Sequence, residues 1–337
     1  MRKSKSQNWE LTQNKIELSH PSGLTRGGIE QCISIGELKK SKMIISEPAL
    51  HKAGIYFNGK KLILCNSLSE NTYSMVFKAM EEDTKIEYAV KMLNSPFLED
   101  KRSTDFDNEI KIYEKIKKKK RLKKHIVKYY GRISSDITTG FIMKYYDHGN
   151  LNEFLSRISE LESTTNLLEK IYTNLCLQVI YPIKYFHSLI PVLLHRDIKS
   201  PNYLLSNSNT LRLCDFNLTR EDTKKNRIST LEKWRTTPRW SAPEIVFEKY
   251  TTKSDVYSIG IVIWEILYTY FNKKYIIPFT SYDNMHIFGA LLAKKIYTLP
   301  MDNIPEEWLN IIRNILDENP KNRLPCYKII KKISKIK

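Results

Sequence analysis

The sequence predicts an α+β fold in which short strands come first and helices follow. Between residues 61 and 92, short apolar and β-branched segments are separated by turn residues, a pattern typical of strands. From Gly149 onward, apolar residues recur at the spacing of one helix face. The chain has 337 residues, which is enough for one large domain or for two lobes.

The composition indicates a globular intracellular protein. Hydrophobic residues make up 41% of the chain, and no run of eighteen apolar residues occurs, so we expect no membrane span. The start of the chain lacks the apolar core of a signal peptide, so nothing indicates secretion. Five cysteines without metal-ligand spacing indicate reduced thiols, and we therefore expect a cytoplasmic location.

The formal charge of +18 allows several interpretations. It fits a nucleic-acid binder, an enzyme acting on acidic substrates, or simply a lysine-rich composition. The run Lys117–Lys124 would suit a nuclear localisation signal or a nucleic-acid patch, but a solvated helix end before the strand Ile126–Tyr130 is the simpler interpretation. Because no zinc-ligand spacing, basic zipper or RNA-binding signature accompanies the charge, we do not expect a nucleic-acid partner.

The first elements can be placed in chain order. Residues 1–57 show little sustained periodicity, which predicts an N-terminal extension that is partly disordered at its start. Three strands are expected next, at Leu62–Cys65, Tyr73–Ala79 and Glu87–Met92. Phe106, Ile110 and Tyr113 then recur at i, i+4 and i+7, which predicts a helix with one apolar face.

The stretch His195–Asp215 combines the residue types that phosphoryl transfer needs. Because charge spreads over the oxygens of the moving group, a protein contributes by positioning, by divalent metal and by cations. Asp197 is a candidate hydroxyl-orienting base with the cation Lys199 nearby, and Asn202 and Asp215 offer two oxygen ligands for Mg²⁺. Two short strands joined by a polar turn are predicted to hold these residues on a hairpin: Tyr203–Leu205 and Leu211–Leu213.

These residues resemble the catalytic loop and the magnesium motif of the eukaryotic protein kinases. The resemblance covers about residues 61–335 and implies a bilobal protein-kinase-like fold. Its N-lobe, a small antiparallel sheet with one main helix, would span residues 58–143. A hinge at 144–147 would lead into a mainly helical C-lobe at 148–337.

The same resemblance implies the chemistry. The segments HRDIKSPN and SDVYSIGIVIWEIL are most similar to the tyrosine kinase-like group, whose members mostly phosphorylate serine and threonine. It implies ATP as phosphate donor, two Mg²⁺ ions with Mn²⁺ as an alternative, and a protein substrate. An upstream activating kinase is a candidate partner, because Thr223, Ser229 and Thr230 would place a phosphate where Arg196 can pair with it.

Individual roles also follow from the resemblance. Asp197 would orient the acceptor hydroxyl, and Lys199 would neutralise charge on the moving phosphoryl group. Lys91 would contact the α- and β-phosphates, with Glu109 as its ion-pair partner. The other nucleotide-contacting positions implied are the gatekeeper Met143, the hinge residues Tyr145 and Tyr146, and the apolar residues Val76, Ala89 and Leu204.

The chain departs from the family pattern at the phosphate loop. The three glycine positions fall on Ser69, Asn71 and Ser74. Each replacement would cost about 1–2 kcal/mol if left-handed backbone geometry is required there, which predicts weakened nucleotide binding. Asn217 stands where the magnesium motif has glycine, and asparagine is among the residues that best tolerate positive φ.

Three further residues have implied structural roles. Glu244 and Arg323 would form a buried ion pair, and Asp255 would brace the backbone of the catalytic loop. The missing glycines leave open a pseudokinase scaffold that binds nucleotide without transferring phosphate. Lys91, Asp197 and Asp215 are all present, however, and these are the residues that such scaffolds usually lose.

Overall fold

The computed structural model describes residues 54–70, 74–93, 101–135, 138–159, 166–206, 208, 210–222, 237–247, 249–295 and 297–336. The predictions for residues 1–53, for Asn71 and for the three candidate phosphosites lie outside these ranges.

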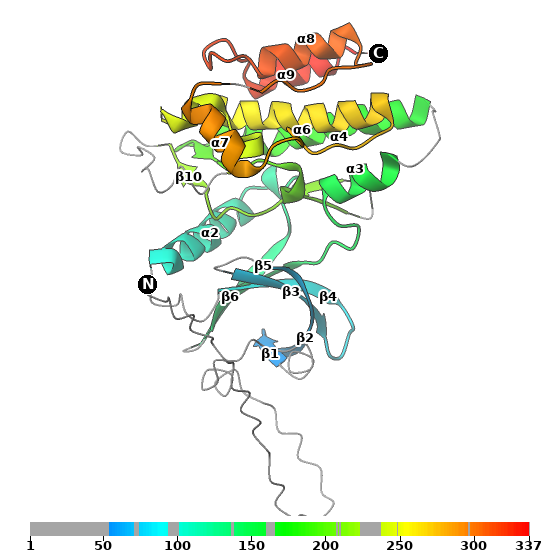
Figure 1. Ribbon diagram of the computed structural model, residues 1–337. Coiled ribbons are helices and arrows are strands. Elements are labelled where there is room, and N and C mark those ends of the chain that lie inside the picture. Colours follow the sequence, from blue (N-terminus) through cyan, green and yellow to red (C-terminus); the bar gives the residue numbers. More distant parts are fainter. Residues whose placement is uncertain are drawn as a thin grey trace, which may run out of the picture. The chain divides into compact units, whose positions relative to one another are not determined.

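Strands dominate the first part of the described chain and helices the second (Figure 1), as expected for an α+β fold. The strands are β1 Gly54–Phe57, β2 Lys60–Glu70, β3 Ser74–Glu81, β4 Glu87–Leu93, β5 Tyr129–Ser135, β6 Thr138–Lys144, β7 Leu193–Leu194, β8 Tyr203–Leu205, β9 Leu211–Leu213 and β10 Arg220–Glu221. The α-helices are α2 Lys101–Lys117, α3 Leu151–Ser159, α4 Asn166–His187, α6 Thr252–Asn272, α7 Asn284–Leu292, α8 Glu306–Ile315 and α9 Cys326–Ile333. Short 3₁₀-helices are η3 Leu122–Lys124, η4 Ser200–Asn202, η5 Pro238–Trp240 and η6 Pro243–Val246.

An antiparallel sheet forms the first lobe. Within the described residues its six strands have the order β1-β2-β3-β4-β6-β5. Side chains alternate between the two faces of a strand. Residues on one face therefore form their own buried cluster: Ile55, Leu62, Leu64, Phe77, Ala79, Val90 and Ile142.

Strand β1 corrects the predicted boundary of the extension. Residues 54–57, assigned to the extension from the sequence, pair with β2 from Gly54 opposite Ile63 to Phe57 opposite Lys60. The turn between them has φ of 51° at Asn58 and 78° at Gly59. An Asn-Gly pair with two positive φ values is the preferred two-residue hairpin turn, so the sequence did carry a signal for this strand.

Helix α2 packs on the sheet through the face predicted from its periodicity. Phe106, Ile110 and Tyr113 are all buried. The rings of Phe106 and Tyr113 lie 5.4 and 5.2 Å from the ring of Phe141 in β6, measured between centroids. This packing fixes the helix that carries Glu109 relative to the strands.

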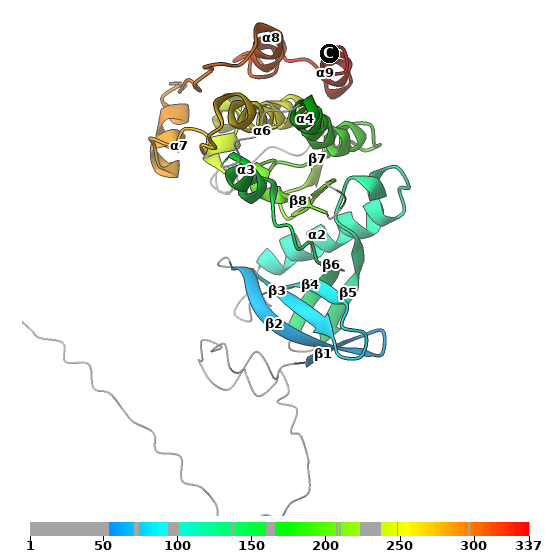
Figure 2. The ribbon, with the colours of Figure 1, turned by 90° about the vertical axis from the view of Figure 1, so that its right-hand side faces the viewer.

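The second lobe is built around α4 and α6, which lie side by side in both views (Figures 1 and 2). Helix α6 is buried along most of its length. It begins with a capping box in which Thr251 accepts a hydrogen bond from the Lys253 backbone and Ser254 accepts one from the Thr251 backbone. Among the described residues, we find no helix long and apolar enough to cross a bilayer.

Candidate active site

A cleft of about 510 Å³ brings most of the predicted nucleotide-contacting residues together. Its lining includes Ser69, Val76, Ala89, Lys91, Glu109, Met143, Tyr145, Tyr146, Asn202, Leu204 and Asp215. These residues come from β2, β3, β4, α2, β6, the hinge and the β8–β9 hairpin. The aliphatic side chains of Val76, Ala89 and Leu204 give the cleft apolar walls suited to a flat base.

Sequence reasoning did not assign several of the lining residues to the site, Leu68 and Cys214 among them. Leu68, just before Ser69, and Cys214, just before Asp215, both line the cleft. Both residues could have been predicted, because each is the direct neighbour in sequence of a predicted site residue. Ser74, predicted to contact nucleotide, is not among the lining residues and is buried at the start of β3. Contact between Ser74 and nucleotide stays a prediction.

The backbone at the former glycine positions is extended where it is described. Ser69 pairs with Val76, just after a register shift between Ser67 and Ser69, and Ser74 pairs with Leu93, both in antiparallel strands. Neither serine is among the residues with positive φ. The estimated cost of left-handed geometry thus does not apply to these two serines, since strands β2 and β3 continue through them.

Lys91 is held by two carboxylates at the back of the cleft. Its Nζ lies 2.8 Å from Glu109 Oε2 and 2.9 Å from Asp215 Oδ1. Burial opposes the charge on Lys91, but the fields of Asp215 and Glu109 outweigh it and hold the pKa of Lys91 above its ordinary value. Burial also raises the pKa of Glu109 to about 7, while Lys91 opposes that rise.

The magnesium motif is tied to α2 as well. The backbone N–H of Phe216 donates to Glu109 Oε1 at 3.2 Å. Asp215 has φ of 62°, whereas Asn217 is not among the residues with positive φ. The left-handed residue of this motif is thus the aspartate, and Asn217 does not need the conformational tolerance expected of it. Burial opposes the charge on Asp215, but Lys91 and Lys199 hold its pKa below the ordinary value.

Three polar side chains surround Asp197 of the catalytic loop. Lys199 Nζ lies 2.7 Å from Asp197 Oδ2 and donates to Thr237 Oγ1 at 3.0 Å. The Thr237 hydroxyl in turn donates to Asp197 Oδ1 at 2.8 Å. Asn202 Nδ2 donates to Asp197 Oδ2 at 3.1 Å and to its backbone carbonyl at 2.8 Å. Hairpin β8–β9, with the predicted bounds, fixes Asn202 and Asp215 at its two ends.

Asp255 braces the loop as predicted. Its carboxylate accepts the backbone N–H groups of His195 and Arg196, each at 3.0 Å. His187 Nε2 lies 2.8 Å from the same carboxylate, and the Tyr250 hydroxyl donates to it at 2.7 Å. Burial opposes ionisation, but His187 and these donors hold the pKa of Asp255 below its ordinary value. The brace supports Arg196 at a strained φ of 71°.

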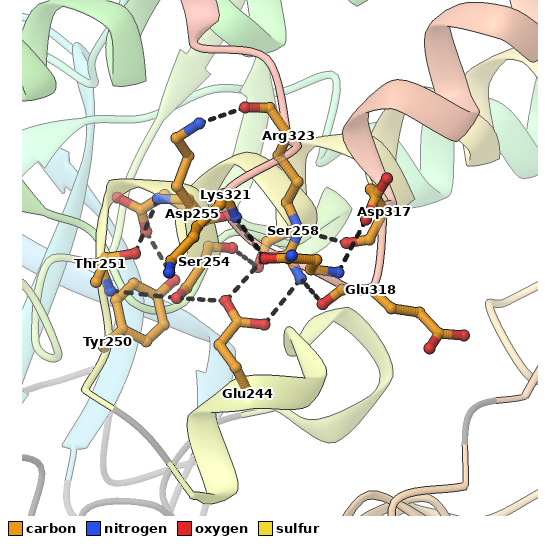
Figure 3. A network of polar contacts seen from close by, with 12 residues as sticks. Glu244, Tyr250, Thr251, Ser254, Asp255, Ser258, Asp317, Glu318, Lys321 and Arg323 are labelled. Atoms are coloured by element: carbon orange, nitrogen blue, oxygen red, sulfur yellow. Dashed lines mark hydrogen bonds and ion pairs between the residues drawn. The ribbon is translucent and has the colours of Figure 1, made fainter.

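The predicted ion pair between Glu244 and Arg323 is buried and bidentate, with N–O distances of 2.7 and 2.8 Å (Figure 3). Ser254 at the start of α6 also donates to Glu244, at 2.8 Å. This network joins η6, α6 and the segment before α9. It holds the chain that follows Thr237 against the helical lobe.

Glu265 is a structural residue that sequence reasoning did not assign. Its carboxylate accepts hydrogen bonds from Ser200 at 2.8 Å, Trp240 Nε1 at 2.9 Å and the Tyr275 hydroxyl at 2.9 Å. Burial raises the pKa of Glu265 to about 7, and these three donors oppose the rise. The sequence did indicate such a role, because Glu265 is the single acid in the apolar run Ile259–Leu267 and a buried carboxylate requires hydrogen-bond partners.

The donor set fits a magnesium ion held between protein and phosphate. The two Nδ2 hydrogen bonds of Asn202 go to Asp197, which leaves the amide oxygen as its ligand atom. Asp215 contributes a carboxylate from the other end of the hairpin. Mg²⁺ prefers oxygen ligands and is commonly held by one or two protein groups together with substrate phosphates.

Comparison with known proteins agrees with the resemblance seen in the sequence. The protein kinase domain model matches residues 65–333. Stress-activated protein kinase alpha of Dictyostelium discoideum is 29% identical over 82% of this chain, which covers 42% of that protein. Ankyrin repeat-containing protein kinase A of the same organism is 31% identical over 82% of the chain, covering 17% of the relative. Serine/threonine-protein kinase CTR1 of Arabidopsis thaliana is 29% identical over 53% of the chain and 21% of its own length.

The chain spans less than half the length of each of these relatives, between 17% and 42%. The matched region contains the cleft, the catalytic loop and the magnesium motif described above. Taken together with the bilobal architecture, this match shows that the chain belongs to the eukaryotic protein kinase family.

Proposed function

We propose that this kinase domain is active and transfers the γ-phosphate of ATP to serine and threonine hydroxyls of protein substrates. The observation that carries the proposal is the assembled contact between Asp197, Lys199 and Thr237. Named relatives that are serine/threonine kinases support the acceptor type. One relative, shkA of Dictyostelium discoideum, is a dual specificity kinase, so the acceptor requires a direct test.

Each residue has a defined task in this reaction. The carboxylate of Asp197 would accept a hydrogen bond from the substrate hydroxyl and orient its oxygen toward the γ-phosphate. Lys199 remains charged, because Asp197 and Asp215 outweigh the effect of burial and raise its pKa. It can therefore stabilise negative charge on the transferred group. Lys91, fixed by Glu109, would hold the other phosphates.

The metal would be held by Asn202 and Asp215. When bound, Mg²⁺ or the alternative Mn²⁺ would neutralise charge on the phosphate oxygens. The protein's own contribution is to keep both ligands on one short hairpin, at the ends of β8 and β9. This placement limits the rearrangement needed when nucleotide binds.

The test is phosphate transfer from labelled ATP with Mg²⁺ to the protein itself and to a generic basic substrate. Transfer by wild type should be lost in Asp197→Ala and kept in Asp302→Ala, which changes an exposed aspartate. Acid hydrolysis of the labelled product should yield phosphoserine and phosphothreonine. Phosphotyrosine alone would contradict the acceptor type, and equal transfer by Asp197→Ala would contradict the mechanism.

A catalytically silent scaffold is the second candidate, favoured by Ser69 in the place of a phosphate-loop glycine. It would bind nucleotide without transferring phosphate. Binding should be measured with a fluorescent ATP analogue, and transfer should be assayed before and after treatment with an upstream kinase. Nucleotide binding with no transfer in either state would favour the scaffold.

We also propose a cytoplasmic location and activation by an upstream kinase acting between residues 223 and 230. The side chains of Lys118, Lys119 and Lys120 are exposed at the end of α2, which supports a solvated helix end. A fluorescent fusion of the full chain should stay in the cytoplasm. Nuclear accumulation that disappears when these three lysines become glutamine would contradict this location.

A further inference from the structure

A second cavity, of about 810 Å³, lies apart from the catalytic residues. It is bordered by the last turns of α2, by η3, by the start of β5, by the hinge, by the β8–β9 turn and by Arg212 of β9. Its lining residues are Tyr113, Lys117, Lys123, Ile126, Val127, Lys128, Tyr129, Tyr130, Lys144, Tyr146, Ser206, Ser208 and Arg212. None of Lys91, Asp197 or Asp215 is among them.

The lining is strongly basic. It includes four lysines and Arg212, and it contains no aspartate or glutamate among the described residues. Just outside the lining, Glu114 lies 3.8 Å from Lys117, with both side chains about half exposed, and it also acts on Tyr129. Such an exposed pair contributes little. The cations therefore repel one another across a shared space, and an anion placed there would relieve that repulsion.

The basic side chains are held against aromatic rings. Lys117, Lys128 and Lys144 place their ammonium groups 5.4, 4.7 and 5.6 Å from the ring centroids of Tyr129, Tyr130 and Tyr146. These contacts limit the freedom of three long side chains before any ligand arrives. Preorganisation of this kind reduces the entropy lost on binding.

Arg212 fixes the opposite border. Its Nη1 donates to the carbonyls of Lys123 and Lys124, the last residues of η3. The β9 strand is thereby joined to the turn that carries Lys123. Burial lowers the pKa of the neighbouring His125, and the cations Arg212 and Lys124 lower it further, as expected in an electropositive environment.

We propose that this cavity binds a small polyanion carrying two or more phosphate groups, at a site separate from the nucleotide cleft. The volume lies within the ~300–1,000 Å³ of typical small-molecule sites. Lysine and arginine donors form strong, charge-assisted hydrogen bonds with phosphate, and the hydroxyls of Ser206 and Ser208 add neutral donors.

The position of the site links it to the catalytic machinery. Tyr113, Lys144 and Tyr146 line both this cavity and the nucleotide cleft. Tyr113 lies one turn after Glu109 on α2. A bound polyanion would therefore contact the helix that positions the partner of Lys91. Binding itself does not depend on phosphate transfer, so failure of this proposal and failure of the proposed kinase activity are separate results.

The probe is inorganic tripolyphosphate, titrated by calorimetry into the full chain at one fixed ionic strength. All proteins carry Lys91→Met, which removes the phosphate-contacting cation of the nucleotide cleft. The test variant replaces three cavity lysines by glutamine, Lys117, Lys123 and Lys128. The matched control replaces Lys118, Lys119 and Lys120, which are exposed and do not line the cavity, so the net charge changes equally.

We expect binding of one tripolyphosphate per chain, weakened at least tenfold (~1.4 kcal/mol) in the cavity variant and less than about twofold in the control. Equal weakening in both variants would mean attraction to overall charge and would overturn the proposal. So would unchanged affinity in the cavity variant, or binding of an acidic peptide with no binding of tripolyphosphate.

A second pair of variants tests the proposal independently, in case the protein with three substitutions does not fold. Lys128→Glu adds an anion to the cavity, and Lys118→Glu makes the same change on the exposed surface outside it. Far-ultraviolet circular dichroism checks that both are folded. Loss of tripolyphosphate binding in Lys128→Glu alone supports the site, and equal binding by the two variants overturns it.

Discussion

At the scale of single residues, the catalytic centre depends on one hydroxyl that joins two charged groups. Thr237 Oγ1 accepts from Lys199 and donates to Asp197. Its oxygen therefore sets the separation between the base and the cation. Lys199 Nζ also contacts Asp197 Oδ2 directly, at 2.7 Å.

Replacing Thr237 by valine preserves the shape and removes the hydroxyl. Loss of a hydrogen bond worth ~1–1.5 kcal/mol should lower kcat about tenfold, with the KM for ATP nearly unchanged. Steady-state kinetics with a serine-containing peptide measures both constants. Thr237→Ser keeps the hydroxyl and should retain most of the activity; an equal loss in the serine and valine variants would contradict the role of the hydroxyl.

At the scale of elements, buried contacts decide how helices and loops meet. Glu265 joins α6 to η4 and η5 through three donors. Because its pKa is about 7 in the folded protein, above the ordinary value of 4.5, the folded state binds a proton more readily than the unfolded state. Its stabilising contribution is complete below the ordinary pKa and is lost as pH rises through about 7.

The free energy of unfolding should therefore fall between about pH 5 and 8, and Glu265→Gln should reduce that fall by on the order of 1–3 kcal/mol, which leaves the part due to Glu109. Urea unfolding of wild type and variant across this range measures the difference. Glu307→Gln, which changes an exposed acid in α8, should leave the pH dependence as in wild type. Parallel pH profiles for wild type and Glu265→Gln would contradict this assignment.

The contact between α6 and α8 depends on Gly260. A Cβ at this position would lie 2.5 Å from Ile315 Cγ2 and 2.7 Å from Leu316 Cδ2. Gly260→Ala should therefore destabilise the fold by ~1–3 kcal/mol, in spite of the better helix propensity of alanine.

Gly289 in α7 provides the matched control for Gly260, because a Cβ there meets no atom within 4 Å. Gly289→Ala should stabilise the protein by up to ~1 kcal/mol, the difference in helix propensity. Thermal unfolding of the two variants should show shifts of opposite sign. A stabilised Gly260→Ala protein would contradict the close approach of the helices.

At the scale of the whole described domain, Phe216 connects the two lobes. Its ring lies 4.7 Å from Tyr113 of α2, 5.6 Å from Phe186 of α4 and 5.5 Å from His195, between centroids. The side chain is completely buried. Packing at Phe216 and the ion pairs of Lys91 thus bind the same two lobes together.

Phe216→Ala should cost ~3–5 kcal/mol of stability through the cavity that it leaves. It should also lower kinase activity by loosening α2 and Glu109. Denaturant unfolding and a transfer assay measure the two effects. Phe247→Ala removes a ring that is 52% exposed and should change stability little; equal losses in both variants would contradict the role of Phe216.

Local sequence patterns determined much of this protein. The hairpin at 203–213, the apolar face of α2 and the α+β order follow from residue periodicity and turn chemistry, which act over a few neighbouring residues. The roles expected of Lys91, Asp197, Asn202 and Asp215 come from the resemblance of their motifs to those of the protein kinases. The Asn-Gly pair before β2 also allowed a hairpin turn to be predicted from the sequence, but this turn was not predicted.

Only the tertiary structure decided which distant residues meet. Glu265 contacts Ser200 and Trp240, which lie far from it in the chain. The burial of Ser74 and the basic cavity between α2 and β9 likewise depend on segments that are distant in the sequence. Periodicity identifies which face of an element is apolar, but it does not specify which other element covers that face. The lysines of the Lys117–Lys124 run are exposed, as expected of a solvated helix end, and only the folded chain shows that Lys117 and Lys123 line one cavity with Arg212.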